Sequence, residues 1–140
     1  MPATSVTEPK YISPIVNPKS YIVYIPAVIV AAGIAFVSLW ENPQSSFALQ
    51  MNDKLIHALM YAVLTLTLLL PQIRKTRLGW SVYLIAGLTA FLYGCMMEVL
   101  QTACTATRTA EWADVLADGI GVIVALIIVE NIRNRKSHEE

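Results

Sequence analysis

Four apolar segments, separated by short polar segments, dominate the chain. Two of them, 21–40 and 78–97, contain no charged residue over twenty positions, and 55–72 contains a single histidine. Because the hydrocarbon core of a bilayer is about 30 Å thick, about twenty helical residues are enough to cross it. The fourth segment reaches this length only if Asp114 and Asp118 are accepted in its first two turns. We therefore predict four membrane-spanning helices and a functional reason for the two aspartates.

The predicted organisation is one all-α domain, a membrane-spanning four-helix bundle. Residues 1–20 are polar and contain four prolines, so we expect an irregular tail there. The helical domain covers residues 21–132, and a tail of basic and then acidic residues follows at 133–140. The expected spans are 21–40, 53–72, 78–103 and 112–132.

The composition argues against a soluble protein. Charged residues make up 14% of the chain and hydrophobic residues 56%, whereas a soluble domain has about 25% charged residues. A soluble four-helix bundle would also need a polar face on every helix, and the segments 21–40 and 78–97 have none. A nucleic-acid partner is not expected, because the pI is near 6.7 and no basic patch is interleaved with aromatic residues.

The basic residues predict the orientation of the bundle. Lys and Arg in short loops favour the cytoplasmic side of a membrane, and only Lys54 and Arg108 fall on the other side of the predicted spans. Trp40, Trp80 and Trp112 lie at predicted span ends, where such rings prefer the membrane interface. We expect an integral protein of the inner (plasma) membrane with both termini in the cytoplasm. The cytoplasmic residues are Lys10, Lys19, Arg74, Lys75, Arg77, Arg133, Arg135 and Lys136.

Small and polar residues form one stripe on each of the last three predicted helices. Residues at i, i+3, i+4 and i+7 share a helix face. Small residues and charges in a membrane both turn toward neighbouring helices or a wet cavity. We therefore expect the stripes to face one another and to form a shallow polar pocket that opens to the outside. They comprise Asp53, His57, Tyr61 and Thr65; Gly87, Ala90, Gly94, Glu98 and Gln101; and Asp114, Asp118, Gly121 and Ala125.

The predicted pocket carries an excess of negative charge. Four stripe carboxylates face two cationic side chains, Lys54 and Arg108, which leaves two negative charges. Such an excess is costly in a low-dielectric setting. Three outcomes are open: His57 takes a proton, a carboxylate takes a proton, or a cation binds. A histidine with carboxylates suits a divalent ion, but metal binding is the weaker hypothesis, because the chain has no HExxH pattern and no tight ligand spacing. We therefore assign no metal site and expect no cofactor.

Two of the carboxylates also have a structural interpretation. Asp114 can cap the N-terminus of the fourth predicted helix, and either Asn52 or Asp53 can cap that of the second. Negative charge at a helix N-terminus stabilises the helix by about 0.3–1 kcal/mol. Capping does not account for Asp118, which lies a full turn inside its predicted helix. Asp118 therefore needs a partner or a chemical role.

Glu98 is unfavourably placed, because negative charge is destabilising in the last turns of a helix. It can pair with Arg108 and fasten the third helix to the outer loop, or it can take part in chemistry. Lys54 and Glu111 are expected to be solvated charges at the interface. For Tyr61, packing is favoured over proton donation.

The polar motifs resemble those of the VanZ-like family of bacterial integral membrane proteins, over roughly residues 50–130. The chain departs from that family at Asp118, where relatives usually carry Asn, and the extra carboxylate changes the charge balance. The resemblance rests on Asp53-Lys54-x-x-His57-x-x-x-Tyr61, Glu98-x-x-Gln101, Arg108 and Asp114-x-x-x-Asp118-x-x-Gly121.

The family is named for a member associated with low-level teicoplanin resistance, so the resemblance implies a protein of the cell envelope but no particular reaction. Our leading hypothesis is a binding protein in contact with membrane lipids. Its outward pocket engages an envelope lipid head group or a glycopeptide-related ligand, and Arg108 grips a carboxylate or phosphate. One alternative is a membrane hydrolase or transferase acting on a lipid-linked envelope precursor, with His57 or Glu98 as general base. The other is a structural or partner-binding module.

Overall fold

The computed structural model describes residues 19–40, 47–72, 78–105 and 110–139. Within these ranges the chain is helical apart from short connections, and it contains no strand. This confirms the predicted all-α fold. The elements are α1 (Lys19–Ile22), α2 (Ile25–Leu39), α3 (Phe47–Leu69), the 3-10 turn η1 (Leu70–Gln72), α4 (Trp80–Cys104) and α5 (Trp112–Glu139).

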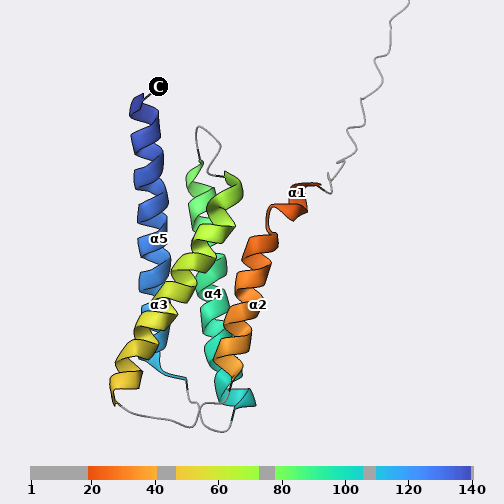
Figure 1. Cartoon of the computed structure of the whole chain (residues 1–140), viewed down its shortest axis with the longest axis vertical. Helices are drawn as coiled ribbons and strands as arrows, with labels where there is room; N and C mark the ends of the chain where they lie inside the picture. The colour runs from red at the N-terminus through yellow and green to blue at the C-terminus, as the bar shows by residue number, and fades with distance from the viewer. Residues whose placement is uncertain (1–18, 41–46, 73–77, 106–109, 140) are drawn as a thin grey trace, which may run out of the picture.

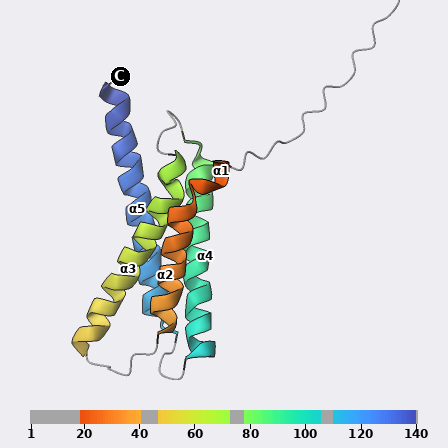
Figure 2. The same ribbon diagram turned by 45° about the vertical axis from the view of Figure 1, so that its right-hand side comes forward.

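Helices α2 to α5 form a bundle in which successive helices run in opposite directions (Figure 1). Helix α3 crosses the bundle obliquely in both views (Figures 1 and 2). It packs most extensively against α5 and less extensively against α2 and α4. The antiparallel order brings the last residues of α2 and α4 to the same end as the first residues of α3 and α5. We call this the polar end, and we call the opposite end, where Arg133 and Arg135 lie on α5, the basic end.

Three helices are long and apolar enough to cross a membrane, over Asp53–Gln72, Trp80–Cys104 and Trp112–Arg135. Helix α2 is apolar but has 15 residues, which span about 22 Å at 1.5 Å per residue. The outer faces are covered by large apolar side chains such as Ile85 and Ile120, which are 64% and 59% exposed. A continuous apolar exterior of this kind is suited to lipid and not to water.

The first predicted span is interrupted by a turn between α1 and α2. The backbone N–H of Tyr24 donates to the carbonyl of Tyr21 at 3.0 Å and closes this turn. Pro26 follows in the first turn of α2. Because proline lacks a backbone N–H and fits the first turn of a helix, it starts a new helix here and does not bend a continuous one. The side-chain amide of Gln72 donates to the Tyr24 hydroxyl at 3.1 Å and ties the turn to η1.

Two other helices are longer than predicted. Helix α3 begins at Phe47, so Asn52 and Asp53 lie in its second turn, and the interpretation of either residue as its N-cap is wrong. Helix α5 continues to Glu139, so the expected tail 133–140 is helical through almost all of its length. With 28 residues, α5 is about 42 Å long. It therefore exceeds the thickness of a bilayer core.

The contact between α3 and α5 depends on the missing side chain of Gly121. A Cβ added there would lie 2.8 Å from the carbonyl carbon of Ala58 and 3.0 Å from its Cα. Helices in lipid gain no hydrophobic free energy from meeting one another, so they associate through close contacts of this kind. The small residues of the stripe predicted on α4 are also turned inward. The buried residues of α4 include Gly87, Ala90, Gly94, Glu98 and Gln101.

A second set of contacts fixes the basic end. The Tyr83 hydroxyl on α4 donates to Glu130 Oε2 on α5 at 2.6 Å. Arg133 donates to the same carboxylate at 3.1 Å and also contacts the Tyr83 hydroxyl. The guanidinium carbon lies 5.7 Å from the centre of the Tyr83 ring. These interactions hold α4 and α5 together at the end that lies away from the stripe carboxylates.

We predict that Gly121→Ala lowers the free energy of unfolding by about 1–3 kcal/mol, because the new methyl group overlaps the Ala58 backbone and forces α3 and α5 apart. Thermal unfolding of the purified protein in detergent measures the change. Gly33→Ala is the matched control, because nothing lies within 4 Å of a Cβ added there, and helix propensity alone favours alanine. Equal melting temperatures for the two variants would contradict the close approach.

Candidate functional site

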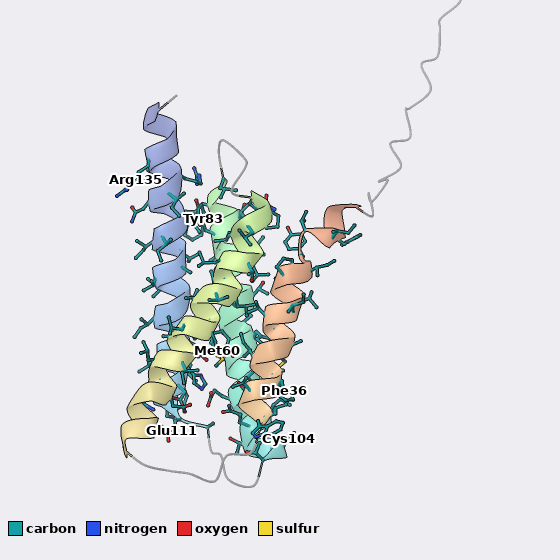
Figure 3. All side chains as sticks on the ribbon, viewed as in Figure 1. Phe36, Met60, Tyr83, Cys104, Glu111 and Arg135 are labelled. Carbon is teal, nitrogen blue, oxygen red and sulfur yellow. The ribbon has the colours of Figure 1, made fainter. Side chains whose placement is uncertain are left out.

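Three predicted site residues meet inside the bundle near its polar end, which Figure 3 marks with Glu111. His57 comes from α3, Glu98 from α4 and Asp118 from α5, and one nitrogen or oxygen atom of each lies within 4.8 Å of the others. Their residues are 3%, 3% and 1% exposed. The three helix stripes therefore face one another as predicted. We call these three residues the inner cluster.

The imidazole of His57 is held between the two carboxylates of the inner cluster. Its Nδ1 lies 3.0 Å from Asp118 Oδ1, a hydrogen-bonding distance, and 3.9 Å from Glu98 Oε1. The shorter contact fixes the orientation of the ring. A histidine oriented by a carboxylate in this way can hold a proton or offer its free nitrogen to a ligand.

Several polar atoms of this region have no hydrogen-bond partner within the described part of the chain. They include Glu98 Oε1, Asp118 Oδ2 and the hydroxyl of Tyr61. Buried polar atoms in folded proteins are nearly always paired, and an unpaired one costs about 1–3 kcal/mol. The other oxygen of Glu98 accepts a hydrogen bond from the backbone N–H of Glu111 at 3.3 Å. Glu98 and Asp118 therefore each keep an oxygen atom that can accept a hydrogen bond or bind a cation.

An outer layer of charges covers the inner cluster. Lys54 Nζ donates to Glu111 Oε2 at 3.0 Å and to Asp114 Oδ1 at 3.1 Å. The Lys54 and Glu111 side chains are 36% and 47% exposed, whereas the Asp114 side chain is 9% exposed. Asp53 joins this layer, because its carboxylate, the His57 imidazole and the Asp114 carboxylate form a second group within 4.8 Å. His57 therefore connects the two layers.

The local sequence explains why α5 can present two aspartates to this site. Asp114 lies in the first turn of α5, where the helix dipole stabilises a negative charge. Asp118 lies one turn further on, and its carboxylate packs against the bare backbone of Gly94. A Cβ added to Gly94 would lie 2.6 Å from Asp118 Oδ2. The small residue on α4 therefore makes the space that the carboxylate occupies.

Tyr61 lies one turn below His57 on α3 and is fully buried. Its ring centre is 6.5 Å from that of His57 and 6.5 Å from that of Tyr93. The Tyr93 hydroxyl donates to the backbone carbonyl of Ala31 on α2 at 2.7 Å. The tyrosines therefore form an aromatic floor beneath the inner cluster, in agreement with the expected packing role of Tyr61.

Three of the sequence-predicted residues behave differently from expectation. Gln101 donates to the backbone carbonyl of Ser38 at 3.1 Å, so it ties α4 to α2 and does not join the inner cluster. Lys54 and Glu111 pair with each other and are not separately solvated. The sequence signal for this pairing was the position of Glu111 immediately before the predicted fourth helix, at the same end of the bundle as Lys54.

The geometry also differs from the expected shallow, open pocket. The inner cluster is closed over, with each residue at most 3% exposed, and the charges that solvent can reach include those of Lys54 and Glu111. Arg108, the predicted partner of Glu98, lies outside the described residues. Among the described residues, the site is therefore a buried polar core with a charged rim.

Comparison with known proteins identifies one family. A family model described as VanZ/LLP1 matches residues 11–133, which is most of the chain. No match was found among the curated proteins or among the solved structures.

We predict that His57 and Asp118 are energetically coupled. In a double-mutant cycle of His57→Ala and Asp118→Ala, the coupling free energy should be about 0.5–3 kcal/mol, because each single variant leaves its partner buried without the other. Unfolding in detergent measures it. The control cycle combines Asp118→Ala with Tyr83→Phe, a residue near the basic end, and these changes should be additive within about 0.5 kcal/mol. Additivity in the first cycle would show that the 3.0 Å contact contributes nothing.

Proposed function

The chain belongs to the VanZ/LLP1 family, and from this membership we propose that it is a membrane protein of the cell envelope that binds a polar envelope component at its polar end. The ligand is an envelope lipid head group or a glycopeptide-related molecule that carries hydrogen-bond donors. The observation that carries this proposal is the set of buried, unpaired polar atoms on Tyr61, Glu98 and Asp118, within the described residues. A bound ligand would supply the missing partners.

The charged rim offers a contact for an anionic group of the ligand. Lys54 is the partly exposed cation of the rim, and its ammonium group already contacts two carboxylates. An incoming phosphate or carboxylate can compete for the same ammonium group, because charge-assisted hydrogen bonds to it are exchangeable in a wet site. Arg108, which lies outside the described residues, is the second proposed contact, because a guanidinium binds phosphate or carboxylate through two hydrogen bonds.

The charge distribution supports a defined orientation in the inner membrane. Arg133 and Arg135 lie on α5 at the basic end, about 22–26 Å from Asp118 at 1.5 Å per residue. Under the positive-inside rule, the basic end faces the cytoplasm and the polar end faces outward. The ligand is therefore taken from the outer side of the membrane.

A second candidate function is an enzyme acting on a lipid-linked envelope precursor. The contact of 3.0 Å between His57 and Asp118 favours it, because an imidazole oriented by a carboxylate is the most common general base. In this version, His57 or Glu98 removes a proton from water or from a substrate hydroxyl.

We predict that the polar end is accessible from outside the cell. Cys104 is exposed there, so a membrane-impermeant maleimide added to intact cells should label it. Arg135→Cys in a Cys104→Ser background should be labelled only after the cells are permeabilised. Cys104→Ser alone controls for labelling of Cys95. Labelling of position 135 in intact cells, without labelling of Cys104, would reverse the orientation.

We predict that the purified protein retains a specific ligand from a total membrane lipid extract, visible as an added mass in native mass spectrometry. Lys54→Gln and Arg108→Ala should each weaken this binding by about tenfold or more, the effect of losing one charge-assisted hydrogen bond. Arg133→Gln at the basic end is the matched control and should bind normally. A parallel titration uses teicoplanin as the probe.

The same assay separates the alternatives. If the wild-type protein, Lys54→Gln and Arg108→Ala all retain the same amount of lipid, ligand binding at the polar end is refuted. The structural or partner-binding role is then the remaining alternative. A new lipid product that forms with the wild-type protein and disappears with His57→Ala would identify the enzyme.

A further inference from the structure

The inner cluster has the composition of a metal-binding site. One imidazole and two carboxylates converge from three different helices, and their nitrogen and oxygen atoms lie within 4.8 Å of one another. His57 Nδ1 is 3.0 Å from Asp118 Oδ1 and 3.9 Å from Glu98 Oε1. Two ligand atoms that each lie about 2.1 Å from one ion are separated by roughly 3.0–3.5 Å. The two separations that involve His57 are therefore within a few tenths of an ångström of those around one ion, and the third lies within 4.8 Å.

A second observation points independently to a ligand at this place. Glu98 Oε1 and Asp118 Oδ2 have no hydrogen-bond partner within the described part of the chain, although their residues are 97% and 99% buried. A carboxylate has about four lone-pair sites and is costly to bury when they are empty. A cation fills such sites, whereas a further hydrogen-bond acceptor cannot.

The charge balance distinguishes the inner cluster from the outer layer. Lys54 lies within 3.1 Å of Glu111 and Asp114, so it compensates the outer carboxylates. Among the described residues, the cationic group found within ion-pair distance of Glu98 and Asp118 is the His57 imidazole. With that imidazole neutral, as a metal ligand must be, the inner cluster carries two negative charges. A divalent cation balances them.

We propose that His57, Glu98 and Asp118 bind one divalent first-row metal ion of the Zn²⁺ or Mn²⁺ type. Imidazole favours such ions over Mg²⁺ and Ca²⁺, and carboxylates complete the coordination. Three protein ligands leave at least one coordination position open. The second group, Asp53, His57 and Asp114, is less suitable because Asp114 Oδ1 is already bonded to the Lys54 ammonium.

This assignment does not depend on the envelope ligand proposed above, and it is tested without one. The full-length protein is purified in detergent, stripped with EDTA, and dialysed separately against Zn²⁺, Mn²⁺, Mg²⁺ or Ca²⁺. Bound metal is then counted by mass spectrometry and the melting temperature is measured. Zn²⁺ or Mn²⁺ should bind at one ion per chain and raise the melting temperature, because the ion binds the folded state alone.

Variants locate the ion. Glu98→Gln and Asp118→Asn keep the shape of each side chain and remove one charge, so each should weaken metal binding by at least about tenfold. Glu130→Gln is the matched control, because Glu130 is a carboxylate of α5 that contacts Tyr83 near the basic end. This variant should bind one ion with unchanged affinity.

Three results would overturn the proposal. One is a stripped wild-type protein that takes up neither Zn²⁺ nor Mn²⁺. The second is stoichiometric binding that persists in both Glu98→Gln and Asp118→Asn. The third is uptake of Mg²⁺ or Ca²⁺ alone. Because the first and third measurements use the wild-type protein, they decide the question even if a variant does not fold. None of the three results would affect the test with lipid extract.

Discussion

The close approach of α3 and α5 at Gly121 is the constraint on which the rest of the structure depends. The Ala58 backbone occupies the space that a side chain would need. Ala58 adjoins His57, and Gly121 lies one turn beyond Asp118, so the same approach brings these two polar groups to 3.0 Å. A wider separation would leave each of them buried in a low-dielectric interior without the other, which is a strongly unfavourable arrangement.

The two ends of the bundle use charge in different ways. At the basic end, Tyr83, Glu130 and Arg133 satisfy one another and join α4 to α5. At the polar end, the Lys54 contacts are also satisfied, but the carboxylates beneath them keep oxygen atoms with no hydrogen-bond partner among the described residues. Buried polar groups without hydrogen-bond partners occur mainly at functional sites. The contrast supports the proposal that the polar end is the functional one.

The stripes were predictable because one physical rule determines them. In lipid, charges and small residues must face other helices, so an i, i+4 pattern such as Asp114 and Asp118 reveals the inward face directly. Pairings across helices were not predictable. Contacts such as Lys54 with Glu111, or Gln101 with the Ser38 carbonyl, depend on helix rotation and tilt. The start of α3 and the end of α5 were not predicted either, because exposed polar residues continue a helix as readily as they end it.

The order of the three inner-cluster residues along the chain has a consequence for biogenesis. His57, Glu98 and Asp118 belong to α3, α4 and α5, and Asp118 comes from the helix that is synthesised last. Proteins are made from the N-terminus, so His57 enters the bilayer before Asp118, the carboxylate that lies 3.0 Å from its ring, exists. The nascent chain therefore passes through a stage in which the imidazole lacks its hydrogen-bonding partner. The insertion of α5 ends that stage.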